Sequence, residues 1–306
     1  MREVIEKTVA EIGTILLGKE REIKLAMTCL LARGHLLIED LPGMGKTTLS
    51  HALATALGLS YNRIQFTSDL LPADVLGVSV YNRDSAEFVF HPGPIFSQLV
   101  LADEINRTTP KSQSALLEAM EERQVSVEGE TRPLPSPFFV IATQNPNTQA
   151  GTFPLPESQL DRFLMRIELG YPDPTAERAL LKGEDRRDVL ARMKPSMTVK
   201  ELEAAQDACA VVKVSDALLD YVQRLVQYTR QAPEFAYGLS PRGALALVGC
   251  SRAWAYIDGR DHVIPEDVQT VLPSIVEHRL REAADFSGHG GAALAQRLLT
   301  NVDIVG

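Results

Sequence analysis

The sequence predicts an α/β fold, in which a parallel, helix-covered sheet precedes an all-helical region. Three observations support this prediction. Short apolar segments alternate with helical ones between residues 35 and 169. A glycine-rich loop at 41–47 separates the first apolar segment from the next helix. After a glycine and two prolines at 170–174, the pattern becomes helical only.

The alternating region is expected to supply five strands and the helices that cover them. Residues 1–34, which precede it, are predicted to be helical, because apolar residues within 20–32 recur at helical spacing. The expected strands are His35–Glu39, Tyr61–Phe66, Phe96–Ala102, Phe138–Thr143 and Phe163–Leu169. Helical stretches lie between them, of which 112–122 is the clearest, and this order favours a parallel sheet.

Two segments interrupt the alternation and are predicted to form β-hairpins. The first pairs 78–81 with 87–90, after a helical turn at 72–77. The second covers 124–134 and turns at a Glu-Gly pair. Insertions of this kind on an α/β core usually contact another molecule.

Beyond residue 171 the pattern predicts helices only. They are expected at 175–182, 199–210, 215–231, 240–258, 265–284 and, more weakly, 292–300. Ser215 and Ser240 are suitable helix caps, and 285–291 is expected to be a flexible loop. The 306 residues suffice for two domains, which we expect at 1–171 and 172–306.

The composition is that of a globular protein, with 45% hydrophobic and 23% charged residues. The net charge of −9 argues against a passive nucleic-acid or membrane binder. The sequence has no apolar run of membrane-spanning length and no signal-peptide core at its start, so we expect a cytoplasmic protein without membrane insertion. Cys29, Cys209 and Cys250 form no C-x-x-C pair and are expected to be buried thiols.

The glycine-rich loop predicts a phosphate-binding site, or P-loop. Its residues are Pro42, Gly43, Met44, Gly45, Lys46 and Thr47, followed by Thr48. The glycines let backbone N–H groups converge on an anion, at which the following helix points its positive end. Lys46 is expected to reach the β- and γ-phosphates, and Thr47 to bind Mg²⁺. The common pattern G-x-x-x-x-G-K-[ST] is not met, because Asp40 stands at its first glycine.

Polar residues at the ends of later strands complete a candidate catalytic site. Asp103 and Glu104 end an apolar strand, at the sheet edge where open α/β folds bind ligands. Asp103 would hold Mg²⁺ through its water shell, and Glu104 would polarise a water for attack on the γ-phosphate. Asn145, after the fourth strand, can orient that water. Arg162 lies just before the fifth strand, with Asp161 placed to orient it.

These motifs, in this order, resemble those of AAA+ ATPases and, within that class, of the MoxR family. The resemblance extends from Leu16 to Phe163, nearly the whole ATPase core. The segments that carry it are Glu39–Thr47, Leu101–Arg107, Gln113–Met120, Ala142–Pro146 and Leu160–Phe163. Asp40 in place of the first glycine also fits MoxR proteins.

The resemblance implies roles for individual residues. Asn145 would be the sensor-1 residue, and Arg162 the arginine finger that reaches a neighbouring subunit's nucleotide. Gly18 and Lys19 stand where this class contacts adenine. Arg242, within Gly238–Gly243, matches the sensor-2 motif of a helical lid near the γ-phosphate, and whether it acts in its own subunit stays open. The two hairpins match the helix-2 insert and the pre-sensor-1 insert.

The resemblance also implies an ATP hydrolase that uses ATP and Mg²⁺, works as a head-to-tail ring of six subunits, and remodels or activates a client protein. Such proteins act as chaperone-like factors in metal-cofactor insertion or complex maturation, often with a von Willebrand factor A domain protein. Three alternatives are a magnesium-chelatase-type motor subunit, a nucleic-acid helicase and a non-hydrolysing scaffold. The acidic charge and few basic residues near the second hairpin (Arg123 and Arg132) argue against the helicase, and Glu104, Asn145 and Arg162 together argue against the scaffold.

Overall fold

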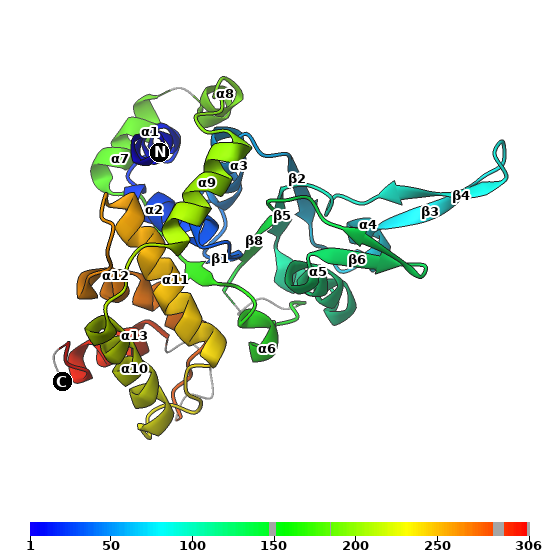
Figure 1. The fold of residues 1–306 in the computed structure, drawn as a ribbon. Helices are drawn as coiled ribbons and strands as arrows, with labels where there is room; N and C mark the ends of the chain where they lie inside the picture. Colours follow the sequence, from blue (N-terminus) through cyan, green and yellow to red (C-terminus); the bar gives the residue numbers. More distant parts are fainter. Residues whose placement is uncertain (147–150, 184, 284–290, 305–306) are drawn as a thin grey trace.

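The computed structural model of the chain describes residues 1–146, 151–183, 185–283 and 291–304 (Figure 1). The loop expected at 285–291 lies outside them, except for Gly291. Among the described residues, no helix is long and apolar enough to cross a membrane. Figure 1 shows helices α10–α13 on one side of the sheet and the β3–β4 hairpin projecting from the other.

The predicted parallel sheet is present, with all five strands in the order β2-β5-β8-β1-β9. Its strands are β1 (Leu36–Glu39), β2 (Tyr61–Gln65), β5 (Leu99–Asp103), β8 (Phe139–Gln144) and β9 (Met165–Ile167). Strand β1 lies between β8 and β9, so the loop that follows β1 leaves the sheet beside the end of β8. This order positions the candidate site.

Apolar side chains alternate between the two faces of the sheet, and each face has its own buried cluster. Leu36 and Ile38 pack on one face, whereas Leu37 packs on the other with helix α5 (Pro110–Glu122). The first cluster includes α1 (Arg2–Gly13), α2 (Glu20–Leu31) and α3 (Lys46–Ala56), and continues into the helices beyond residue 171. The helical region is therefore packed on the sheet, and the boundary at 171 stays a prediction.

Both predicted hairpins are formed. The first consists of β3 (Gly77–Asn82) and β4 (Glu87–Pro92), after the short helix α4 (Pro72–Leu76). The second consists of β6 (Gln124–Val127) and β7 (Glu130–Pro133). Arg132 lies over the ring of Phe90 at 4.1 Å, so the two hairpins touch.

The helices beyond residue 171 match the predicted ones, with differences at some ends. They are α7 (Pro174–Lys182), α8 (Arg186–Ala191), α9 (Val199–Ala210), α10 (Asp216–Gln231), α11 (Pro241–Ile257), α12 (Pro265–Val276) and α13 (Gly291–Asn301). Helix α8 was not predicted, and residues 14–19 break the helix expected over 1–34. Helix α12 ends before 284 because the following backbone pairs with 234–236.

Candidate active site

The glycine loop forms a pocket of about 280 Å³ at the carboxyl edge of the sheet. Gly43 and Gly45 have φ angles of +86° and +93°, which favour glycine, and α3 begins directly after Gly45. The lining residues are Pro42, Gly43, Gly45, Lys46, Thr47, Thr48, Asp103, Glu104 and Asn145, all of them predicted site residues. Met44 instead packs against the core. The amino end of a helix and glycine backbone therefore face this pocket, as a phosphate cradle requires.

Lys46 is buried and points inward at the carboxyl end of β1. Its Nζ donates to the backbone oxygen of Asp40, to that of Leu41 at 3.3 Å and to Oδ1 of Asn145 at 2.9 Å. Burial lowers the pKa of the Lys46 ammonium, and nearby carboxylates, first that of Asp40, oppose this shift. All three of its partners are uncharged acceptors, so a phosphate in the cradle would offer the ammonium a stronger one.

Glu104 and Lys46 are joined through Asn145. Asn145 Nδ2 donates to Oε1 of Glu104 at 3.2 Å, while its Oδ1 accepts from Lys46. Glu104 has a φ of +58°, an unusual value for a residue with a side chain, and its backbone N–H donates to Thr143 Oγ1 at 2.9 Å. Gln65 donates to its other carboxylate oxygen at 3.0 Å. The carboxylate is thereby fixed at the rim of the pocket.

Asp103 is held by two side chains from neighbouring strands. Its Oδ1 accepts from Thr143 at 2.5 Å, and its Oδ2 accepts from Arg63 Nε at 3.0 Å and Nη2 at 2.6 Å. Sequence reasoning missed Arg63. A charged residue in the short strand β2 was the available signal, but only the pairing of β2 with β5 shows its partner.

The pocket fits a nucleotide with Mg²⁺. The hydroxyl of Thr47 and the carboxylate of Asp103 line it together, and Mg²⁺ prefers oxygen ligands supplied by one or two carboxylates and by phosphates. No group of three or more His, Cys, Asp or Glu in the described ranges could hold a metal by itself. A Mg²⁺ ion here would therefore depend on phosphate oxygens for its remaining ligands.

Asp40 has a structural task that explains why no glycine stands there. Its Oδ2 accepts the backbone N–H groups of Leu169 at 2.7 Å and Gly170 at 2.6 Å, and its Oδ1 accepts that of Leu41 at 2.7 Å. Lys19 Nζ donates to the carbonyls of Leu169 and, at 2.8 Å, Tyr171. These bonds attach the glycine loop to the segment that leads into the helical region.

A larger cavity of about 770 Å³ lies where α1 meets α2, and Leu16, Leu17, Gly18 and Lys19 are among its lining residues. A Cβ on Gly45 would lie 3.9 Å from Leu16 Cδ2, so the glycine loop approaches this junction. Gly18 has a φ of +70°, and a Cβ there would come within 2.8 Å of Asp173 and Ala176. The residues expected to contact adenine are thus beside a cavity near the loop.

Arg162 and Arg242 do not line the pocket, but they lie side by side. Arg162 Nε is 3.0 Å from one carboxylate oxygen of Glu121, and Arg242 Nη2 is 2.7 Å from the other. We call Glu121, Arg162 and Arg242 the arginine face. Sequence reasoning missed Glu121, because nothing at the end of α5 distinguishes it from other exposed acids.

The expectation that Asp161 orients Arg162 is wrong. Asp161 accepts a hydrogen bond from Arg279 Nε at 2.6 Å and one from Ser240 Oγ at 3.3 Å. Arg162 instead pairs with Glu121, so the two neighbouring residues bind different partners.

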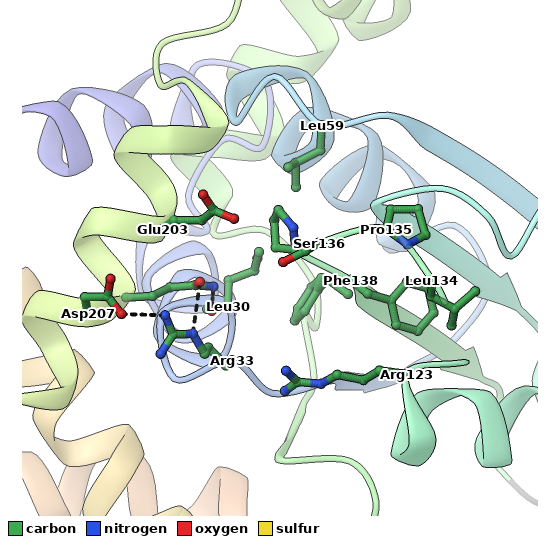
Figure 2. Close-up of a pocket in the computed structure, with 13 residues that line it drawn as sticks. Leu30, Arg33, Leu59, Arg123, Leu134, Pro135, Ser136, Phe138, Glu203 and Asp207 are labelled. Atoms are coloured by element: carbon green, nitrogen blue, oxygen red, sulfur yellow. Dashed lines mark hydrogen bonds and ion pairs between the residues drawn. The ribbon is translucent and has the colours of Figure 1, made fainter. Parts of the chain in front are cut away.

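A further cavity, of about 410 Å³, lies near the amino end of β8, at the opposite end of the strands from the glycine loop (Figure 2). Figure 2 shows Arg33 bound to α9 and Arg123 facing it from the other side. Arg33 donates to Gln206 at 3.3 Å and to Asp207 at 2.7 Å. None of the predicted site residues lines this cavity, so we exclude it as the catalytic pocket.

Comparisons with known proteins agree with the site. Residues 35–165 match the model of the ATPase family associated with various cellular activities (AAA), and residues 227–298 match that of the AAA lid domain. The uncharacterized protein YeaC of Bacillus subtilis is 44% identical over 99% of this chain and 96% of its own. The chaperone MoxR1 of Mycobacterium tuberculosis is 40% identical over 90% of this chain and 75% of its own.

The fold has a solved counterpart. A crystal structure from Cytophaga hutchinsonii, of a protein provisionally described as an ATPase, superimposes with a TM-score of 0.90 at 35% sequence identity. The match covers 100% of this chain and 96% of that one. Sheet, hairpins and helical region therefore belong to one shared architecture.

Proposed function

Because the chain belongs to the MoxR family of AAA+ ATPases, we propose that it hydrolyses ATP to remodel or activate a partner protein. The observation that carries this proposal is the series of contacts from Lys46 through Asn145 to Glu104 in the glycine-loop pocket. It joins a phosphate-binding cation to a carboxylate through one amide. Those are the groups that phosphoryl transfer to water requires.

Each pocket residue has a task in this proposal. Lys46 binds the β- and γ-phosphates, and the backbone N–H groups of the glycine loop donate to them. Thr47 and Asp103 would hold Mg²⁺, which would neutralise phosphate charge. Glu104 accepts a proton from the attacking water, and the amide of Asn145 orients that water.

The arginine face is proposed to act on a neighbouring subunit. No arginine is among the described residues that line the pocket, although Arg63 and Arg107 bind its carboxylates from outside, whereas Arg162 and Arg242 meet on Glu121. A head-to-tail ring, which we take to have six subunits, would bring this face to the next subunit's pocket. Both arginines would then stabilise charge on the transferring phosphoryl group in trans.

The β3–β4 hairpin is proposed to meet the client protein. Val78, Val80, Tyr81 and Phe88 are exposed on it, Phe88 to 72%. Exposed apolar groups that gather on a projecting element mark interaction sites. The similarity to the chaperone MoxR1 supports a chaperone-like role, and we propose a cytoplasmic client, for example one with a von Willebrand factor A domain.

The test is ATP turnover and its dependence on the glycine loop. We expect the wild-type chain to release phosphate from ATP in the presence of Mg²⁺, and Lys46→Ala to lose ATP binding because the phosphates lose their point charge. The matched control is Lys182→Ala, at an exposed lysine of α7, which should behave as wild type. A wild-type chain that neither binds nor hydrolyses ATP contradicts the proposal.

A further inference from the structure

Arg279 is a buried arginine that binds the turn on which Arg162 stands. Its side chain is 4% exposed, and it follows the end of α12. Besides Asp161 Oδ1, its guanidinium donates to the backbone oxygens of Asp161 at 3.3 Å, Phe163 at 2.7 Å and Leu164 at 3.1 Å. These partners flank Arg162 on both sides. Arg279 thus fixes the backbone of the turn without contacting the Arg162 side chain in any of these bonds.

His278 makes a second hydrogen-bonding contact with the same turn. Its Nε2 lies 3.0 Å from the carbonyl oxygen of Phe163. A carbonyl only accepts, so Nε2 is the nitrogen that donates a proton in this bond. Burial lowers the pKa of His278 well below its usual value, and the charge of Arg279 lowers it further. Two consecutive residues of the helical region therefore hold one carbonyl beside Arg162.

The turn is also joined to Arg242. Ser240 Oγ donates to Asp161 and accepts the backbone N–H of Gly243 at 3.0 Å, so it caps α11, the helix that carries Arg242. Asp161 is thus shared between Arg279 and the start of α11. The turn before β9, the end of α12 and the start of α11 form one hydrogen-bonded unit.

Only an arginine can make this set of contacts. A guanidinium presents five N–H donors in a rigid fork, whereas a lysine ammonium presents three from a single atom. Burial lowers the pKa of Arg279 and the carboxylate of Asp161 raises it, but a guanidinium keeps its proton in proteins. The permanent charge and the fork geometry together specify where the turn lies.

We propose that Arg279 is a positioning residue for the arginine finger: it fixes the turn that carries Arg162, so that the placement of the helical region sets the reach of the finger into the neighbouring subunit. This inference rests on the proposed role of Arg162. It predicts that loss of Arg279 impairs the neighbour's nucleotide pocket and leaves the pocket of its own chain intact.

The first experiment compares Arg279→Lys with Arg260→Lys. Arg260 binds Asp267, whose side chain is 1% exposed, at 2.7 Å, so its replacement also removes a buried ion pair of the helical region, away from the turn. We expect Arg279→Lys to lower kcat about 10–100-fold, because small misplacements of a catalytic group cost that much. ATP affinity should be unchanged, and Arg260→Lys should keep the wild-type kcat.

Mixed rings give the readout that a purely structural role would not change. Arg279→Lys subunits mixed with Lys46→Ala subunits should recover part of the turnover, since some interfaces then pair an intact pocket with an intact finger. Arg279→Lys mixed with Arg162→Ala should not recover, because every interface lacks a working finger. A mixture of Lys46→Ala with Arg162→Ala serves as the reference.

The outcomes separate the two claims. If the reference mixture recovers but Arg279→Lys with Lys46→Ala does not, the positioning role is wrong and the proposed function stands. If the reference mixture fails in rings shown to be mixed, the trans role of Arg162 is wrong. Should Arg279→Lys fail to fold, Asp161→Asn replaces it in both mixtures. This change weakens the bond between Arg279 and residue 161, and it leaves the bonds from Arg279 to the backbone oxygens of the turn in place.

Discussion

The glycine-loop pocket and the arginine face hold their charges in different ways. In the pocket, Lys46 at the start of α3 binds Asn145 just after β8, which binds Glu104 just after β5. At the arginine face, Glu121 comes from α5, Arg162 from the turn before β9 and Arg242 from α11. One half of the candidate site is therefore a property of the sheet edge. The other half is complete only when α11 of the helical region brings Arg242 to the Arg162–Glu121 pair.

This comparison predicts that substitutions in the two halves impair ATP hydrolysis in different ways. Arg162→Ala should cause the largest loss of kcat. An arginine supplied in trans to a transferring phosphoryl group contributes about 10³–10⁵ in kcat. We expect a loss of that size with unchanged ATP affinity, measured by phosphate release and by nucleotide titration. Arg187→Ala, at an exposed arginine of α8, is the control. Weaker ATP binding by Arg162→Ala would mean that it serves its own pocket.

Glu104→Gln tests the pocket half at its catalytic group. Loss of a general base costs about 10²–10⁴ in rate, while the amide keeps the shape of the side chain. The variant should therefore bind ATP and hardly hydrolyse it, and rings held in that state should retain the client during purification. Glu118→Gln, on an exposed turn of α5, is the control. Full turnover by Glu104→Gln would remove Glu104 from the mechanism.

His35 tests whether the sheet that carries the pocket has its own pH dependence. Burial lowers the pKa of His35 from 6.5 to about 4. Its Nδ1 accepts the N–H of Val140 at 3.0 Å, and its Nε2 lies 3.2 Å from the carbonyl of Met120, so the neutral ring is fully bonded. Because the folded pKa is depressed, this stabilisation is complete above pH 6.5 and is lost as pH falls towards 4.

The size of that loss is about 3 kcal/mol, from 1.36 kcal/mol per pKa unit. Urea unfolding at pH 7.5 and pH 4.5 measures it, and His35→Gln should reduce the difference between the two by that amount, while buried His278, whose pKa is also lowered, keeps its own contribution. His91→Gln, at an exposed hairpin position, should leave it unchanged. An equal pH dependence in wild type and His35→Gln would assign the effect to other groups.

The sequence predicts the pocket half well because its signals are local. Five strands, the glycine loop and the residues that end β5 and β8 each follow from a short pattern, and parallel strands bring their carboxyl ends to one edge. The contacts of the arginine face join residues far apart in the chain. Arg242 and Glu121 are 121 positions apart, and Arg279 and Asp161 are 118 apart.

Tertiary contacts explain two places where the structure differs from the prediction, namely Asp161 and the end of α12. Asp161 neighbours Arg162 in sequence, yet it binds Arg279, which the segment after α12 brings to it from 118 positions away. Helix α12 could continue by its apolar pattern, yet it ends at Val276, where the next residues bind the turn that carries Arg162 and pair with 234–236. Tertiary contacts decide these points, and no local pattern contains them.

Asp40 joins the two halves of the candidate site, so its replacement should affect both of them. The effect on each half should be the smallest among these predictions. Its carboxylate binds Leu169 and Gly170, the start of the segment that leads to the helical region. Asp40→Gly would restore the common glycine pattern but remove these bonds. Since a hydrogen bond to a charged group contributes about 1.5–3 kcal/mol, we expect the free energy of unfolding to fall by about 2 kcal/mol.

Asp40→Gly should also lower kcat, because the helical region that holds the finger is then less firmly attached, while ATP affinity changes little because the cradle remains. Chemical unfolding and steady-state turnover measure the two effects, with Asp84→Asn at an exposed hairpin position as the control. Asp40→Asn removes the charge but keeps the shape of the side chain, so its free energy of unfolding and its kcat should lie between those of wild type and Asp40→Gly. If Asp40→Gly instead binds ATP poorly with unchanged stability, Asp40 serves the pocket alone, and the two halves are joined elsewhere.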